Sequence, residues 1–205
     1  MLFKYKLFLI ILLVLGTLME TAAQNQYANG RQKWEGQLVD GRKSGTWTYY
    51  YETGQIASRE QYVNGQLNGQ VKYYYPNGGL QSTEWWKANL LQDSAFYYFQ
   101  NGDLHKKGIY KDGLYAGTWV FYDEDTGMLK RTGSYQNGLP HGEWLSYDEE
   151  GRLMQQGHYL HGREDGFWQF YEEGKLRYEG HYQEGKQVGE WYQYSRKGKK
   201  KSYKY

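Results

Sequence analysis

The chain has 205 residues and no cysteine, so it forms no disulfide and must be stable through packing and hydrogen bonding alone. Its formal net charge of +2 is close to neutral, and this balance excludes a general attraction to nucleic acid. Aromatic residues make up 19% of the chain, so we expect a core built largely from rings.

Residues 1–23 have the pattern of a secretory signal peptide. Two early lysines precede an uncharged apolar run over residues 7–19, and small residues then offer a cleavage site between Ala23 and Gln24. The apolar run has 13 residues, whereas a helix needs roughly 20 to span a bilayer. The sequence therefore predicts export to the periplasm or the cell exterior, with residues 24–205 as the mature chain.

The mature chain repeats itself about every 24 residues, with the pattern Gly-x-Trp followed by Tyr three residues later. A fixed period of this length is typical of an array of one supersecondary unit. We expect an opening half-unit, 27–40, and seven units: 41–64, 65–88, 89–112, 113–137, 138–161, 162–184 and 185–205. The aromatic residues predicted to have a structural role in these units are Trp47, Tyr50, Tyr74, Tyr98, Trp119, Tyr122, Trp144, Tyr147, Trp168, Tyr171, Trp191 and Tyr194.

Each unit is predicted to be a β-hairpin. In the first unit, residues 46–51 are rich in Thr, Trp and Tyr, which favour strands. Gly54 permits a tight turn, residues 55–62 form the returning strand, and Asn64-Gly65 is a strong hairpin signal. The predicted fold is all-β, an elongated, twisted antiparallel meander of about seven tandem hairpins with about 14 to 15 strands.

The motif at residues 133–151, Gly-x-Tyr-x-x-Gly-x-x-x-Gly-x-Trp-x-x-Tyr-x-x-x-Gly, resembles the MORN repeat. It resembles more closely the bacterial variant of that repeat, found in YwqK-type antitoxin-like proteins. The resemblance covers residues 27–205 and implies hairpin repeats in an elongated sheet. It also implies a binding or scaffold role, with no catalytic residue to carry over.

The histidines form no metal-binding pattern in the sequence. His158 and His181 share one repeat position, but equivalent strands lie about 9.6 Å apart. That separation is too large for one zinc ion, whose bonds to nitrogen are about 2.0–2.1 Å. His105, His141 and His161 are predicted to be single turn or strand positions without partners.

No catalytic constellation stands out from the repeats. The acidic run at residues 123–127 begins like a calcium loop, but Ser134 occupies the place where such a loop needs Glu. We expect this and the other acidic tips to be solvated turns, with a weak cation site along their row as the alternative. The sequence thus predicts no enzyme, no cofactor and no metal.

An aromatic strip in the N-terminal units is the candidate binding site. It comprises Tyr49, Tyr51, Tyr73, Tyr75, Tyr97 and Phe99. Alternation along a strand predicts that Tyr49 and Tyr51 share the face of Trp47. The ring at the position of Tyr51 gives way to Asp123 in a later unit. These rings either pack beneath the curl of the sheet or bind a protein or a glycan, since rings supply large contact area.

The unit at residues 89–112 is irregular, because Ala95 stands where other units have Trp and Asp93 where they have Gly. A core does not tolerate a void of that size cheaply. We therefore expect Trp85 or Trp86, on the preceding strand, to fill the volume beside Ala95.

The C-terminal residues 196–205 hold six basic residues and no acid. Lysines there either guard the open edge of the sheet or contact an anionic membrane surface. Taken together, the sequence predicts an exported, non-enzymatic repeat scaffold that binds a partner protein. The alternatives are a glycan-binding envelope module that uses the aromatic strip, and an antitoxin-like inhibitor of an exported toxin.

Overall fold

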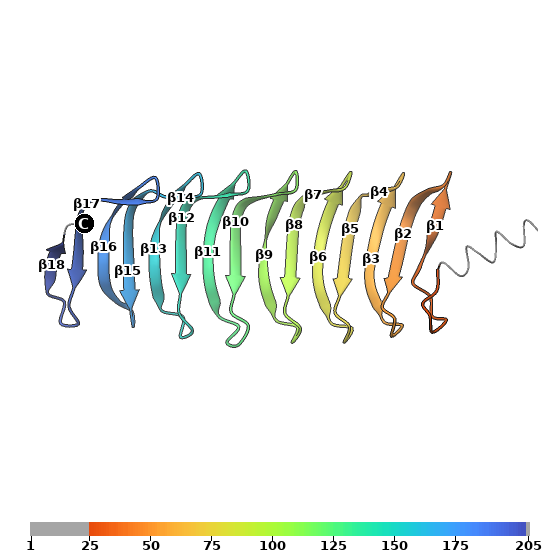
Figure 1. Cartoon of the computed structure of the whole chain (residues 1–205), viewed down its shortest axis with the longest axis horizontal. Helices are drawn as coiled ribbons and strands as arrows, with labels where there is room; N and C mark the ends of the chain where they lie inside the picture. Colours follow the sequence, from red (N-terminus) through yellow and green to blue (C-terminus); the bar gives the residue numbers. More distant parts are fainter. Residues whose placement is uncertain (1–24, 204–205) are drawn as a thin grey trace, which may run out of the picture.

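The computed structural model describes residues 25–203, so the predicted signal peptide lies outside the described residues. These residues form one open antiparallel sheet in which each strand pairs with the next along the chain. The result is a long ribbon with β1 at one end and β18 at the other (Figure 1). Among residues 25–203 there is no helix of the length and apolarity that a membrane crossing requires.

The sheet has eighteen strand segments. Fifteen of them are full strands: β1 (Trp34–Val39), β2 (Arg42–Tyr50), β3 (Ile56–Val63), β5 (Gly69–Tyr74), β6 (Leu80–Lys87), β8 (Asp93–Tyr98), β9 (Leu104–Lys111), β10 (Leu114–Tyr122), β11 (Leu129–Gln136), β12 (Leu139–Tyr147), β13 (Leu153–Leu160), β15 (Gly166–Glu172), β16 (Lys175–Gln183), β17 (Lys186–Tyr194) and β18 (Lys200–Tyr203). The other three have two residues each: β4 (Gln66–Leu67), β7 (Leu90–Leu91) and β14 (Arg163–Glu164).

Each short segment pairs with the same neighbour as the strand that follows it, so the ribbon is fifteen strands wide. This confirms the expected all-β meander of tandem hairpins. The break between short segment and strand lies next to a residue with positive φ, such as Gly69 at 113°. Asp93 takes the same position with φ 63° and stabilises it by accepting a hydrogen bond from the Ser94 amide at 2.8 Å. Asp is among the residues that tolerate this conformation.

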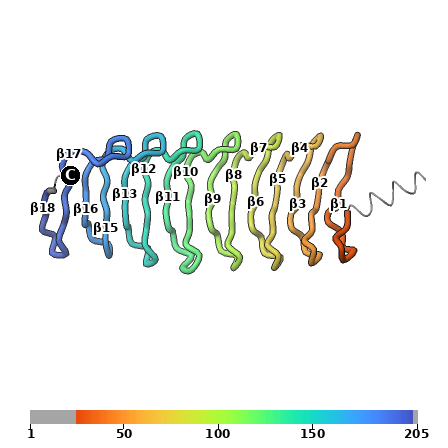
Figure 2. Tube along the Cα trace, viewed as in Figure 1, coloured from red at the N-terminus to blue at the C-terminus, as the bar shows by residue number. Residues whose placement is uncertain are grey.

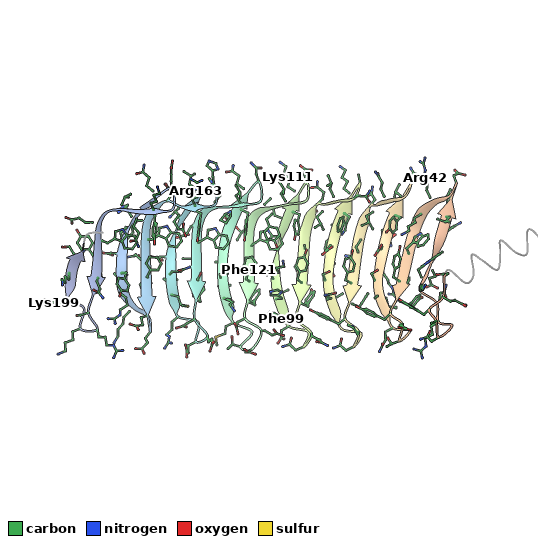
Figure 3. The ribbon with its side chains drawn as sticks, in the orientation of Figure 1. Arg42, Phe99, Lys111, Phe121, Arg163 and Lys199 are labelled. Carbon is green, nitrogen blue, oxygen red and sulfur yellow. The ribbon has the colours of Figure 1, made fainter. Side chains whose placement is uncertain are left out.

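Turns of two kinds lie along the two long edges of the ribbon (Figure 2). On one edge, two-residue turns such as Asn64-Gly65 have positive φ at both positions, 51° and 82°. This geometry matches the twist of the flanking strands and explains the Asn-Gly signal. The other edge carries the longer tips. Side chains project from both edges, and Figure 3 labels Arg42 and Arg163 on the first and Lys199 on the second.

The core is a single row of indoles on one face of the sheet. We call this face the tryptophan face, after Trp47, Trp119, Trp144, Trp168 and Trp191, each 8% exposed or less. Neighbouring tyrosines meet these indoles edge-on, as Tyr182 does with Trp191 at a centroid distance of 5.1 Å. These rings from neighbouring strands cover the indoles without a second layer of structure.

Every indole of the row lies over a glycine on the preceding strand. A Cβ atom built on Gly133 would be 2.1 Å from the ring of Trp144, and one on Gly108 would be 2.2 Å from the ring of Trp119. The indole N–H then donates to the carbonyl of the residue after the glycine, for example from Trp144 to Ser134 at 3.1 Å. The repeated Gly and Trp are therefore two halves of one packing unit.

Candidate functional site

The predicted aromatic strip divides into two sets of residues. Tyr49, Tyr73 and Tyr97 lie in a row on the tryptophan face, where Ser58 and Ser82 alternate with them as cross-strand partners. All three tyrosines are partly buried. This row of hydroxyl groups is the part of the predicted strip that lies beside the indoles.

Tyr51 and Tyr75 lie beyond the ends of their strands and have a different role. The Tyr51 hydroxyl donates to the carbonyl of Tyr74 at 2.6 Å, and that of Tyr75 to the carbonyl of Tyr98 at 2.8 Å. Tyr27 makes the same bond one unit earlier, to the carbonyl of Tyr50 at 2.7 Å. These three hydroxyls therefore tie neighbouring units together in the N-terminal part of the ribbon.

Phe99, the last member of the strip, packs against His105 with ring centroids 4.4 Å apart. Burial, and to a lesser degree the nearby Lys106, lowers the pKa of His105. A neutral imidazole suits a position against an apolar ring. The partners of Phe99 thus lie within its own hairpin.

The row of indoles is interrupted between Trp47 and Trp119, where Val71 and Ala95 occupy the tryptophan position. At the glycine position that faces them stand Glu60 and Glu84. The register of β3 and β5 places Glu60 across from Val71, because Arg59 pairs with Lys72. The same reasoning places Glu84 across from Ala95, because Thr83 pairs with Phe96. In these two units the Gly–Trp pair is therefore replaced by a glutamate and a small apolar residue, Glu60 with Val71 and Glu84 with Ala95.

We call this interruption the glutamate segment. It consists of the residues of the tryptophan face on β3, β5, β6 and β8: Ser58, Glu60, Tyr62, Val71, Tyr73, Ser82, Glu84, Trp86, Ala95 and Tyr97. Of the two residues expected to fill the volume beside Ala95, Trp86 lies on the face of Ala95, where its indole donates to Glu84, whereas Trp85 does not lie there. The side chain across from Ala95 belongs to Glu84, while Trp85 packs against Phe96 at 6.5 Å on the opposite face.

Neutral groups hold both carboxylates of the glutamate segment. Glu60 accepts hydrogen bonds from the Tyr62 hydroxyl at 2.6 Å and the Ser58 hydroxyl at 2.8 Å. Glu84, only 7% exposed, accepts one from the Trp86 indole at 3.1 Å and a long one from Ser82 at 3.5 Å. Within residues 25–203 neither carboxylate forms an ion pair.

The tyrosines around these carboxylates are held in their neutral form. Burial raises the pKa of Tyr73 to about 12. Burial, followed by the hydrogen bond to Glu60, raises the pKa of Tyr62. Burial, followed by the contact with Tyr110, raises the pKa of Tyr97. The segment therefore offers hydroxyl donors, ring faces and two carboxylate side chains.

The fold brings two histidines together. His141 and His161, which show no partner pattern in the sequence, lie with ring centroids 5.7 Å apart, because the Gly162 amide donates to the carbonyl of Pro140 and joins their two segments. The Nδ1 atom of His141 is buried and has no hydrogen-bond partner. No group of three or more potential metal ligands occurs within residues 25–203.

The acidic tips are closed by their own residues. Asp123 accepts hydrogen bonds from the amides of Asp125 and Thr126 and pairs with Lys130 at 3.0 Å. The Lys130 bond, with these amide bonds, lowers the pKa of Asp123. The oxygens that a cation would need are thus already in use at this tip.

Sequence reasoning missed Glu60 and Glu84. A glutamate in a strand ordinarily belongs to a solvated face, and neither residue lies in a known motif. The signal that could have found them is the comparison of units with each other: glutamate replaces glycine only where tryptophan is also absent from the next strand.

A family model described as a MORN repeat variant matches four segments of the chain, residues 43–64, 67–84, 140–161 and 169–184. Solved structures align over smaller shares of their own length. TarM is 10% identical with a TM-score of 0.31, and the GtfA/B complex bound to UDP and GlcNAc is 12% identical with a TM-score of 0.26. Both alignments cover 61% of this chain and 24% of the other. At these TM-scores neither likeness bears on function. The search of curated proteins found no match.

Proposed function

This chain is a MORN-repeat variant protein, and from that premise we propose that it is an exported, non-enzymatic scaffold that binds a partner protein on its tryptophan face. One observation carries the proposal. The otherwise regular row of indoles is replaced, over the glutamate segment, by tyrosine hydroxyls and two carboxylates. Hydrophobic packing alone does not require this change.

Several features support a binding role rather than a catalytic one. The array places the same hairpin side by side, so a partner meets an extended surface rather than an enclosed pocket. Tyr73 offers a partly buried ring whose remaining surface is available to a ligand, while Lys43 and Lys106 lie on the rings of Tyr49 and Tyr97. Rings of this kind dominate the energetics of protein interfaces.

The proposal is tested by site-directed photo-crosslinking. A photoreactive phenylalanine analogue replaces Tyr73 on the tryptophan face, and in a matched control it replaces Phe96 on the opposite face. We expect the Tyr73 position to capture one protein from the native envelope. Excess unlabelled chain should compete for this capture, whereas a folded Tyr73→Ser/Tyr97→Ser variant should not.

Three other outcomes have defined meanings. Capture only from the Phe96 position would contradict binding on the tryptophan face. Capture of polysaccharide fragments instead of protein would favour the glycan-binding alternative, which the same rings also suit. Identification of the captured protein as an exported toxin would place the chain with antitoxin-like inhibitors.

Export is supported by the order of basic, apolar and small residues before Gln24. The mass of the protein recovered from its native host provides the test. We expect a chain that begins at Gln24 in the envelope or the medium. Recovery of the full chain from the cytoplasm would contradict export and leave the binding proposal intact.

A further inference from the structure

The two carboxylates of the glutamate segment do more than fill space. In the regular units an indole covers a bare glycine, and a Cβ on that glycine would be 2.1–2.3 Å from the ring. A side chain at residue 60 or 84 therefore occupies volume that an indole takes elsewhere. An apolar side chain such as Leu or Met would fill that volume without the cost of burying a charge. Volume alone does not account for two glutamates.

A buried carboxylate is costly unless a cation or several hydrogen bonds compensate it. Glu84 is 7% exposed, and its hydrogen bonds come from one indole N–H and one distant hydroxyl. The donors to Glu60 are two neutral hydroxyls. Both groups therefore lack the positive charge that would offset their desolvation.

Lysine ammonium groups lie on rings at both ends of the glutamate segment. Nζ of Lys43 is 4.8 Å from the ring centroids of Trp47 and Tyr62, and it donates to the Tyr49 hydroxyl. Nζ of Lys106 is 4.4 Å from the centroid of Tyr97 and donates to the hydroxyl of Tyr115 at 2.8 Å. The tryptophan face thus already holds ammonium groups on its own rings.

Between these two lysines, the tryptophan face offers a tyrosine ring of the same kind together with two carboxylates. Tyr73 lies diagonally across from both Glu60 and Glu84 in the sheet register, and within residues 25–203 neither carboxylate has an ion-pair partner. A ring and a carboxylate together bind a cation more strongly than either does alone, because the cation lies over the ring face while it forms an ion pair with the carboxylate.

We propose that the glutamate segment receives a basic side chain, lysine or arginine, from the partner protein. This inference rests on the proposed function and adds the chemistry of recognition. The incoming cation lies over Tyr73 and pairs with Glu60 or Glu84. It supplies a positive charge of the kind that Lys43 and Lys106 place on rings at the two ends of the segment.

The probe for this site is a fluorescent peptide of alternating glycine and lysine, titrated into the purified mature chain. The test variant, Glu60→Gln/Glu84→Gln, keeps the volume and an acceptor oxygen at both positions but removes the charges. We expect its affinity for the probe to fall at least about tenfold, as for loss of a charge-assisted bond. The matched control, Glu124→Gln/Glu149→Gln, removes the same charge from exposed tips and should change affinity less than about twofold.

A second probe in which every lysine is Nε-acetylated has the same length without the positive charges, and it should not bind. An arginine version should bind as the lysine version does. Circular dichroism and thermal unfolding establish that the variants are folded. Equal affinities of the test and control variants, or binding of the acetylated probe, would overturn the inference.

Crosslinking from Tyr73 separates this inference from the proposed function. If Glu60→Gln/Glu84→Gln leaves capture of the partner protein unchanged, the binding surface stands and the basic side chain is wrong. If the lysine peptide binds but no partner is captured, the cation site stands and the protein-binding proposal fails. Loss of both in the same variant supports the two together.

Discussion

At the scale of single residues, the close approach of indole and glycine is what makes a one-layer sheet stable. The ring lies where the Cβ of the facing residue would otherwise be, so backbone and indole are in direct contact. The indole N–H also donates to a backbone carbonyl on the strand of that facing glycine. Trp119, for example, donates to the carbonyl of Ile109 at 3.0 Å. A buried indole therefore has both its apolar surface and its donor satisfied.

Gly133→Ala tests this contact. The added methyl group would meet the ring of Trp144 at 2.1 Å, so the indole must move out of its place. We expect the free energy of unfolding to fall by about 3 kcal/mol, as for overpacking in a tight core. Urea unfolding, followed by tryptophan fluorescence, measures the loss.

Gly127→Ala is the matched control for Gly133→Ala. Gly127 lies in a hairpin tip with φ +67°, and nothing lies within 4 Å of its added Cβ. Its substitution should cost only about 1 kcal/mol, from the left-handed backbone conformation. Similar losses for the two variants would show that the indole does not lie against the backbone of Gly133.

At the scale of the hairpin, most of the element structure could be predicted from the sequence. Asn64-Gly65 and its equivalents identified the two-residue turns, because few residues tolerate two successive positive φ values. Alternation placed Tyr49 correctly beside Trp47, at a centroid distance of 6.2 Å. The number of residues within the strands is constant from unit to unit, whereas the hairpin tips vary in length. This is expected of paired strands, because a slip of one residue would move every side chain to the other face.

Alternation fails where the strand ends. The register shifts between Tyr49 and Tyr50, and Tyr51 already belongs to the turn. Its hydroxyl then reaches the backbone of the next hairpin, a contact between units that no pattern within one unit predicts. The burial of Glu84 and the partial burial of Glu60 were missed for the same reason, because the space they fill is set by the residue on the following strand.

A double-mutant cycle tests the coupled replacement in the irregular unit. Ala95→Trp alone places an indole against the side chain of Glu84, and we expect a loss of about 2 kcal/mol or more. Combined with Glu84→Gly it rebuilds the regular pair, as Gly108 and Trp119 form it. The double variant should therefore be more stable than Ala95→Trp by about 2 kcal/mol, beyond the effect of Glu84→Gly alone.

The cycle is read from urea midpoints of the four proteins. Glu84→Gly alone should be destabilising, because it leaves a cavity beside Ala95. Additive effects of the two substitutions would mean that residues 84 and 95 do not share one volume. In that case the presence of glutamate at residue 84 would not be explained by the absence of tryptophan at residue 95.

At the scale of the whole molecule, the ribbon is an open sheet whose two ends differ. Strand β1 is mostly exposed, whereas β18 is anchored by side-chain contacts. Nζ of Lys200 pairs with Glu179 at 3.0 Å and lies 3.7 Å from the ring centroid of Tyr192. Burial would raise the pKa of Glu179, but bonds from Tyr194 and Lys200 lower it overall. The basic tail thus has a structural role in closing the last hairpin.

Removal of residues 196–205 tests what the tail does for the assembly. The truncation leaves β17 as the terminal strand and takes away the backbone partner of Trp191, which is 1% exposed in the full chain. An unpaired strand beside an uncovered indole is a template for edge-to-edge association. We expect the truncated chain to self-associate at concentrations where the full chain is a single species in sedimentation velocity.

The alternative role of the tail, contact with an anionic surface, makes a different prediction for the same truncation. If the lysines serve a membrane, the truncated chain should stay in its original state of association but lose binding to vesicles that contain an anionic phospholipid. Because Lys200 is engaged with Glu179 and Tyr192 while Lys199 and Lys201 are exposed, the substitution Lys199→Gln/Lys201→Gln separates the two roles. It should leave the β17–β18 pairing and the state of association unchanged, so any loss of vesicle binding in this variant would reflect the charges alone.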